Sequence, residues 1–274
     1  MLILCGTPIG HLDDISYRAV KALESADVIY AEDTRRTLKL LNHLELKKPL
    51  RRYDEHNKDA AGEEILSRLL QGETVVLTTD AGMPGISDPG ADLVQLCIAR
   101  EIGFEIIDGP TAFVHAAVGS GLDIRRFAFE GFLPKKKSNA IQRLQSFAGD
   151  SRTHIFYEAP HDLLRTLEWI EAEWGDRRAC TARELTKRYE EFRRGKLSEL
   201  IAYYRANEPI GEFVLIVEGA EIEPEVCDEA RILRELRALA EQNYTKKEAV
   251  ATLASKLPVK KSVIYRVAED SRFF

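Results

Sequence analysis

The segment TTDAGMPGISDPG, at residues 78–90, decides the fold of this chain. It follows Val75, Val76 and Leu77, an apolar run rich in β-branched residues that predicts a buried parallel strand. Its three glycines and two prolines predict tight turns that leave main-chain amide and carbonyl groups open to a ligand. Open α/β sheets bind ligands at the carboxyl ends of their strands, so a binding loop is expected here. A plain strand-to-helix turn is the alternative interpretation.

Two more loops of the same kind favour the ligand interpretation. Residues 6–10, GTPIG, follow the apolar run Leu2 to Cys5, and residues 108–112, DGPTA, follow a strand expected at 104–107. Three strand ends that carry Gly and Pro turns predict one shared crevice. Within the segment at 78–90, Pro89 is expected in the first turn of a helix, with Ser87 or Asp88 as its cap.

Composition is that of an ordinary globular protein. The chain has 274 residues, of which 45% are hydrophobic and 31% charged, and this balance argues against disorder. No apolar run is long enough to span a bilayer, and no secretory signal is visible. The four cysteines are scattered singly, without the close pairs of zinc or redox sites, so buried thiols, no metal and a reducing cytoplasm are expected.

Charge is unevenly distributed along the chain. The net charge of −6 argues against a generally basic nucleic-acid binder but not against a local basic face. Residues 225–274 contain ten Lys or Arg and eight Asp or Glu, a net charge of +2, which leaves −8 for the first 224 residues. The tail is therefore a separate electrostatic region.

The first part of the chain predicts β-α-β units with polar side chains at the strand ends. Asp13 and Asp14 are expected to cap a helix whose apolar positions include Ala19 and Leu23, before a strand at 28–30. That strand runs into residues 31–37, AEDTRRT. A helix cap explains Asp33 structurally, but not the two arginines that follow.

Three further polar features each allow a structural and a functional interpretation. His56, in the segment YDEHN at 53–57, is the histidine favoured as functional. Lys135 to Lys137 follow an expected strand, and either a solvated face or a phosphate-contacting loop explains them. Residues 183–195 mix Arg and Lys with Glu, and a solvated surface is their ordinary explanation.

The pattern changes near residue 113, which predicts a domain boundary. The strands expected beyond it, at 127–132, 153–157, 179–182 and 212–217, suggest a mixed sheet. After Gly219 only helices are expected, at 230–241, 246–255 and 260–269. We therefore predict an α/β domain at 1–112, a second α/β domain at 113–221 and a helical tail at 225–274.

Nine segments together carry a family resemblance. They are, in chain order, GTPIGHLDDIS (6–16), AEDTRRT (31–37), EHN (55–57), TDAGMPGISDPG (79–90), GPTAFVHAAVGSGL (109–122), FEGFLP (129–134), FYEAPH (156–161), RELTK (183–187) and GEFVLIVEG (211–219). The chain resembles the tetrapyrrole-methylase superfamily, and within it the ribosomal RNA small subunit methyltransferase I family. No P-loop lysine is present, which suits a cofactor without phosphate.

The resemblance implies the fold and the chemistry. It implies two α/β domains with an S-adenosylmethionine cleft between them, a homodimer, and methyl transfer to the ribose 2′-hydroxyl of a cytidine in small-subunit (16S) ribosomal RNA. By resemblance the cleft is lined by Pro8, Asp80, Met83, Ile86, Thr111, Ala112 and Tyr157.

Catalytic roles are assigned only as candidates. A base assists a hydroxyl that is a poor nucleophile near neutral pH. Asp33, His56 or Glu184 are the candidate bases, and Arg35 and Lys187 the candidate groups that orient ribose or phosphate.

The chain departs from the family pattern at three positions. It has His11 where the family usually has Asn, Met83 where it has Thr, and Asp162 where it has Arg. These changes bear on cofactor affinity and local geometry more than on the class of reaction.

Two other functions remain open at this point. The same fold could methylate a tetrapyrrole or another small molecule, against which the RELTK segment and the helical tail argue. A non-catalytic RNA-binding assembly factor would explain the changes at His11 and Met83, but Asp80 and the three Gly/Pro loops argue for a working cofactor site. For the tail, packing on the parent domain and contact with RNA are both open.

Overall fold

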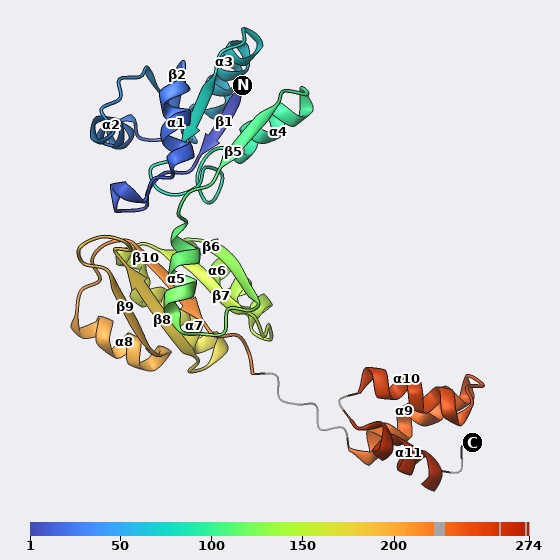
Figure 1. The fold of residues 1–274 in the computed structure, drawn as a ribbon. Coiled ribbons are helices and arrows are strands. Elements are labelled where there is room, and N and C mark those ends of the chain that lie inside the picture. Colours follow the sequence, from blue (N-terminus) through green and yellow to red (C-terminus); the bar gives the residue numbers. More distant parts are fainter. Residues whose placement is uncertain (222–227, 258, 272, 274) are drawn as a thin grey trace. The chain divides into compact units, whose positions relative to one another are not determined.

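The computed structural model describes residues 1–221, 228–257, 259–271 and 273, and divides them into two compact units, Met1–Ala220 and Glu221–Phe274. Unit 1 contains two five-stranded sheets, and unit 2 is helical (Figure 1). The predicted α/β architecture with a C-terminal helical bundle is confirmed.

The first sheet is parallel, in the order β3-β2-β4-β1-β5. Its strands are β1 (Leu2–Cys5), β2 (Val28–Ala31), β3 (Leu50–Arg52), β4 (Val75–Thr78) and β5 (Phe104–Ile107). The predicted strand before the TTDAGMPGISDPG segment is thus confirmed as β4, and every residue of β4 is buried. Such a strand is an uninterrupted apolar run because helices cover both faces of the sheet.

Four helices cover this sheet, two on each face. Helices α3 (Lys58–Leu70) and α4 (Ala91–Ala99) pack on the side of Leu4 and Leu77, and α1 (Tyr17–Ser25) and α2 (Thr34–His43) pack on the side of Ile3 and Val76. The chain leaves the adjacent strands β1 and β4 toward opposite faces of the sheet. Their carboxyl ends therefore form a topological switch point, where doubly wound sheets bind ligands.

The second sheet is mixed, in the order β6-β7-β10-β8-β9. Its strands are β6 (Phe127–Phe132), β7 (Thr153–Glu158), β8 (Arg178–Arg183), β9 (Glu191–Lys196) and β10 (Phe213–Val217), with only β6 and β7 parallel. Helices α6 (Lys137–Phe147), α7 (Pro160–Trp174) and α8 (Leu197–Ala206) share a core on one face. Helix α5 (Ala112–Ser120) packs on the other. The boundary predicted at residue 113 falls in the first turn of α5.

Two local predictions were wrong, and one strand was not predicted. Ser16, not Asp13 or Asp14, caps α1 by accepting a hydrogen bond from the amide of Ala19, because Asp13 and Asp14 lie in a short 3-10 helix (Leu12–Asp14). Helix α4 starts after Gly90, whose φ of 142° places Pro89 before the first turn. Part of the charged segment 183–195 is the edge strand β9, because its arginines pair locally and leave the backbone free to join β8.

Unit 2 has its own core. Helices α9 (Glu229–Glu241), α10 (Lys246–Lys256) and α11 (Lys261–Asp270) bury Ile232, Leu253 and Ile264 against one another. Thr245 and Glu248 form a capping box that fixes the start of α10. The three predicted helices are confirmed within two residues at each end. Residues 225–227 of the predicted tail lie outside the described residues.

The loops after β1 and β5 approach each other so closely that only glycine fits at their contact. A Cβ atom on Gly109 would lie 2.7 Å from the Cα and carbonyl carbon of Gly6, and the amide of Gly6 donates to the carbonyl of Ile107 at 2.9 Å. Backbone atoms cannot yield as a flexible side chain does.

We therefore expect Gly109→Ala to lower the free energy of unfolding by about 1–3 kcal/mol, the usual cost of an overpacked site. Urea unfolding measures the loss. The control is Gly103→Ala, because no described atom lies within 4 Å of a Cβ built there. Equal stability of the two variants would contradict the role of this contact.

Candidate functional site

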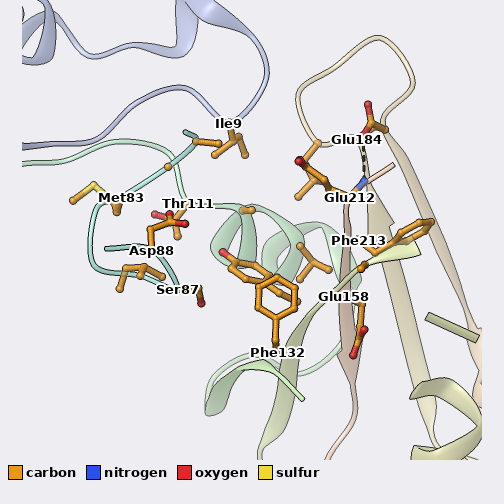
Figure 2. Close-up of a pocket in the computed structure, with 18 of the residues that line it drawn as sticks. Ile9, Met83, Ser87, Asp88, Thr111, Phe132, Glu158, Glu184, Glu212 and Phe213 are labelled. Carbon is orange, nitrogen blue, oxygen red and sulfur yellow. Dashed lines mark hydrogen bonds between the residues drawn. The ribbon is translucent and has the colours of Figure 1, made fainter. Parts of the chain in front are cut away.

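Unit 1 contains a cavity of about 330 Å³ where the strand ends of the first sheet face the second sheet (Figure 2). The segment 81–88 lines one side, with Met83, Ser87 and Asp88, and Glu184, Glu212 and Phe213 line the other. Its volume is in the usual range for sites that hold small molecules. The cavity thus draws on both sheets of the unit.

Backbone hydrogen bonds join the loops that form the first side of the cavity. Thr7 and Gly82 exchange two such bonds, from the amide of Thr7 to the carbonyl of Gly82 at 2.8 Å and in the reverse direction at 3.0 Å. The Thr7 hydroxyl also donates to the carbonyl of Thr79 at 3.2 Å. Main-chain bonds of this kind hold a loop without depending on side-chain identity, so the three loops form one rigid wall.

The cavity walls are largely apolar and aromatic. Tyr157 of β7 packs edge-on against Phe129 at a centroid distance of 4.9 Å and lies 5.6 Å from Phe132. Ile9 and Ile86 add aliphatic surface. Such a wall suits a flat heterocycle, because ring faces and aliphatic groups pack against one another.

Charged side chains gather at the opposite rim. The ammonium group of Lys187 donates to Glu184 at 3.2 Å and lies 3.5 Å from a carboxylate oxygen of Glu212. All three residues line the cavity, and Figure 2 marks the bond between Lys187 and Glu184. The rim therefore offers both a carboxylate and an ammonium group to whatever enters.

Of the seven residues expected to bind the cofactor, five line the cavity: Met83, Ile86, Thr111, Ala112 and Tyr157. Pro8 and Asp80 do not. Pro8 is buried, and the neighbouring Ile9 lines the cavity in its place. Asp80 accepts a hydrogen bond from the amide of Asp33 at 2.8 Å and pairs with Arg36 at 3.5 Å, so it fastens the end of β2 to the end of β4.

Of the five catalytic candidates, Glu184 and Lys187 line the cavity, whereas Asp33, Arg35 and His56 do not. Asp33 caps α2 as predicted and binds the guanidinium of Arg35 at 2.7 and 3.0 Å. This pairing holds the pKa of Asp33 well below its usual range, which makes it a weak base. His56 is exposed, and its amide donates to Asp54 at 2.9 Å.

Sequence reasoning missed several cavity residues, including Asp88, Phe132, Glu158, Glu212 and Phe213. All five stand in segments that carry the family resemblance, and Asp88 is in the TTDAGMPGISDPG segment itself. Their signal was a carboxylate or aromatic residue next to a Gly or Pro turn. Burial raises the pKa of Asp88, and the nearby charge of Asp80 adds to this shift.

Glu158 is a buried carboxyl group at the end of β7. Only 6% of its surface is exposed, and Thr166 of α7 donates a hydrogen bond to it at 3.0 Å. Burial raises the pKa of Glu158 to about 7, and the hydrogen bond from Thr166 opposes this shift without cancelling it. The folded protein therefore holds a proton on Glu158 that the unfolded chain releases near pH 4.5.

This proton predicts a specific pH dependence of stability. Because the folded-state pKa is raised, the free energy of unfolding decreases as the pH rises from 4.5 to 7. We expect Glu158→Gln to be more stable than the wild type by about 1–3 kcal/mol at pH 8, and to show little difference at pH 4.5.

Urea unfolding at pH 4.5, 6 and 8 measures this dependence. Glu24→Gln, at an exposed carboxyl group on α1, is the control for the loss of a negative charge. A stability difference between wild type and Glu158→Gln that is the same at all three pH values would contradict the assignment.

The three departures from the family pattern differ in their surroundings. His11 is exposed, and its amide, not its ring, makes the contact with Thr186 at 2.9 Å. The Met83 sulfur accepts a hydrogen bond from the amide of Gly109 at 3.2 Å, so this thioether links the loop after β4 to the loop after β5. Asp162 lies in the first turn of α7 and pairs with Arg165 at 2.7 Å.

Within the described ranges, no cluster of His, Cys, Asp and Glu could hold a metal ion. Cys5, Cys97 and Cys180 are buried free thiols, as expected, and Cys227 lies outside the described residues. None of the described helices is long and apolar enough to cross a membrane.

The fold is shared with solved structures of other enzymes. The methyltransferase CobJ superposes with a TM-score of 0.63 at 20% identity over 80% of this chain and 94% of its own. Diphthine synthase does so with a TM-score of 0.62 at 16% identity over 80% and 89%. The family model for Tetrapyrrole (Corrin/Porphyrin) Methylases matches residues 1–201. The chain is thus a member of the tetrapyrrole methylases.

Closer relatives identify the branch of this superfamily. The protein named Ribosomal RNA small subunit methyltransferase I from Synechocystis sp. is 43% identical over 98% of this chain and 97% of its own length. Its namesake from Bacillus subtilis is 40% identical over 98% and 89%. The one from Thermotoga maritima is 46% identical over 220 residues, 80% of this chain and 99% of its own. The chain belongs to the ribosomal RNA small subunit methyltransferase I family, as the sequence motifs predicted.

Proposed function

We propose that the protein transfers a methyl group from S-adenosylmethionine to the ribose 2′-hydroxyl of a cytidine in small-subunit (16S) ribosomal RNA. One observation carries the proposal: the cavity at the switch point of the first sheet lies in a chain that matches this methyltransferase family over almost its whole length. Similarity to tetrapyrrole enzymes, at 20% identity or less, concerns the fold alone.

The residues around the cavity fit S-adenosylmethionine. The cofactor combines an adenine ring with two cationic groups, a sulfonium and an ammonium. Tyr157 and the aliphatic side chains offer packing for the ring, and Asp88, Glu184 and Glu212 offer negative charge to the cations. We assign Met83, Ile86, Thr111, Ala112 and Tyr157 to cofactor binding.

When bound, S-adenosylmethionine supplies an electrophilic methyl group, so the protein has mainly to hold the ribose hydroxyl in line with it. Glu184 is the proposed proton acceptor, because it alone among the candidate bases lines the cavity. Lys187 donates to Glu184 at 3.2 Å and orients that carboxylate. Lys187 also offers a positive charge to the RNA phosphate.

Asp33, Arg35, Asp80 and Pro8 have a supporting role in this proposal. Asp80 holds the amide of Asp33, and Asp33 in turn caps α2 and binds Arg35. These bonds fix the positions of the loops after β2 and β4 relative to each other. His56 is exposed on the loop before α3, and we assign it to contact with the RNA substrate.

We expect the product to carry its new methyl group on a ribose oxygen. Incubation with 16S RNA, or with assembled small subunits, and labelled S-adenosylmethionine, followed by nuclease digestion and mass spectrometry, reads the position directly. A methyl group on a base, or transfer to uroporphyrinogen and not to RNA, would overturn the proposed function.

Glu184→Gln in the same assay isolates the proton acceptor. We expect kcat to fall by about two orders of magnitude, the lower range for a general base, with an unchanged calorimetric Kd for the cofactor. The control is Glu24→Gln, at an exposed carboxyl group on α1 that does not line the cavity.

We further propose that unit 2 binds the substrate and takes no part in catalysis. Lys260, Lys261, Tyr265 and Arg266 are all exposed on or next to α11, and side chains of these types contact phosphates and stack on bases. The matched length of the Thermotoga maritima relative, 220 residues at 99% of its own length, equals the length of unit 1. This equality supports a catalytic unit that ends near Ala220.

We expect a protein that ends at Ala220 to bind S-adenosylmethionine as the full chain does but to methylate RNA less well. Its remaining RNA affinity should also depend less steeply on salt, because fewer phosphates are neutralised. Calorimetry and methylation at several salt concentrations test both points. Unchanged methylation with unchanged salt dependence would show that the tail only packs, and loss of cofactor binding would show that it belongs to the core fold.

The assembly and location of the protein are proposed on the family resemblance. A homodimer and a cytoplasmic location both suit an enzyme that acts on ribosomal RNA. The three described thiols are buried and free, which suits a reducing compartment.

A further inference from the structure

We propose that Arg188 and Tyr189 form an RNA-binding tip that holds single-stranded RNA next to the target nucleotide. This inference rests on the proposed function, because it assigns the substrate strand to one rim of the same cavity. Tyr189 stacks on a nucleobase that neighbours the target, and Arg188 contacts a backbone phosphate.

The tip is the direct continuation of the cavity rim. It lies in the loop between β8 and β9, and Lys187, the residue before it, lines the cavity. The next two side chains turn outward, since Arg188 is exposed and 68% of the Tyr189 surface is accessible. A nucleotide in the cavity would therefore have its neighbours within reach of these two side chains.

The loop that carries the tip is held in an unusual conformation. Glu184 and Thr186 have φ values of 50° and 60°, a region that residues with a Cβ atom rarely adopt. Non-glycine residues keep such angles only where the surroundings enforce them, and they concentrate at functional sites.

Contacts on both sides enforce this conformation. The Thr186 hydroxyl accepts a hydrogen bond from the amide of His11 at 2.9 Å, and the Thr186 amide donates to Glu190 at 2.7 Å. Glu190 in turn lies 3.2 Å from His115 on α5. Gly10 packs against Thr186 so closely that a Cβ atom there would lie 2.6 Å from the threonine hydroxyl. The loop is thus braced before any substrate arrives.

The charges of the segment single out Arg188. Arg183 and Arg193 pair with Glu191, Lys187 pairs with Glu184, and Arg194 donates to the carbonyl of Ser120. Among the residues that the structure describes, Arg188 has no carboxylate or carbonyl partner, and its guanidinium lies 5.6 Å from the ring of Tyr189. Its charge is therefore available to a phosphate.

An exposed aromatic ring beside a free guanidinium matches the chemistry of unpaired RNA. Bases that are not in a helix stack on aromatic side chains, and each such stack strengthens binding. Duplex RNA hides its base faces, so the tip favours single-stranded segments. Because every base has a π-face, this contact adds affinity and position without a strong sequence preference.

The test compares RNA binding and methylation in the full-length chain. We expect Tyr189→Ala to weaken binding of single-stranded RNA in a filter assay, and to raise the KM for RNA, by about 5- to 20-fold. The calorimetric Kd for S-adenosylmethionine should not change, and Tyr189→Phe should restore binding because it keeps the ring. Arg188→Gln should lower the slope of log K against log salt by about 0.7, one phosphate contact on a single strand.

Tyr17→Ala is the matched control. Tyr17 is 77% exposed and lies under the ammonium group of Lys21 at 4.8 Å, but it does not line the cavity. Equal effects of Tyr17→Ala and Tyr189→Ala, or RNA binding that Tyr189→Ala leaves unchanged, would overturn the inference. A tip variant that loses affinity for the protein-covered small subunit but not for naked RNA would also overturn it, in favour of a protein partner.

The two proposals fail in different ways. If the wild type binds RNA and methylates no ribose, the proposed function fails, and the filter assay still decides the role of the tip. If the wild type methylates RNA and the tip variants behave as the wild type does, only the tip assignment fails.

Discussion

The contact between the backbones of Gly6 and Gly109 is the constraint on which the site depends. A Cβ atom at either position would lie less than 3 Å from main-chain atoms of the other. The contact brings the ends of β1 and β5 together, and the paired bonds between Thr7 and Gly82 add the end of β4. Three separate strand ends thereby become one wall, whose shape is a property of the main chain.

Because main-chain contacts shape this wall, the chain tolerates its departures from the family pattern. At His11 the contact is made by the amide, so the identity of the ring matters little. At Met83 the sulfur accepts the amide of Gly109 and remains part of the loop contacts. The carboxylate of Glu184 and the ammonium group of Lys187, by contrast, come from the second sheet through the braced loop that follows β8. The loops of the first sheet thus form a rigid wall, and the loop after β8 contributes charged side chains.

The sequence predicted the elements well and the local geometry less well. An uninterrupted apolar run indicated β4 and periodic apolar residues indicated the three tail helices, because burial sets those patterns directly. Strand β9 was missed because its side chains are charged on both faces, and ion pairs such as Arg183 with Glu191 are formed only in the fold. The cap of α1 was predicted at the wrong residue because Asp13 and Asp14 form part of a short 3-10 helix that precedes Ser16.

The same limit applies to the site. Gly and Pro turns indicated where the cavity lies, and five of the expected cofactor residues line it. Asp33 and Asp80 are attractive in the sequence because each is an aspartate at a strand end. In the fold, however, Asp80 binds the amide of Asp33, and Asp33 binds the amide of Arg35. Whether a carboxylate faces a ligand or a neighbouring main chain depends on contacts between distant segments, which a local pattern does not encode.

The order of strands in the first sheet also has a consequence for synthesis. Strand β1 is made before both of its neighbours in the sheet, which are residues 75–78 and 104–107. The apolar segment Leu2 to Cys5 therefore has no partner until Thr78 has been made, and its second edge stays unpaired until Ile107 has been made. Parallel pairings of this range are slow to form because the intervening chain must be ordered first. The nascent chain thus exposes an apolar strand while residues 6–78 are being made.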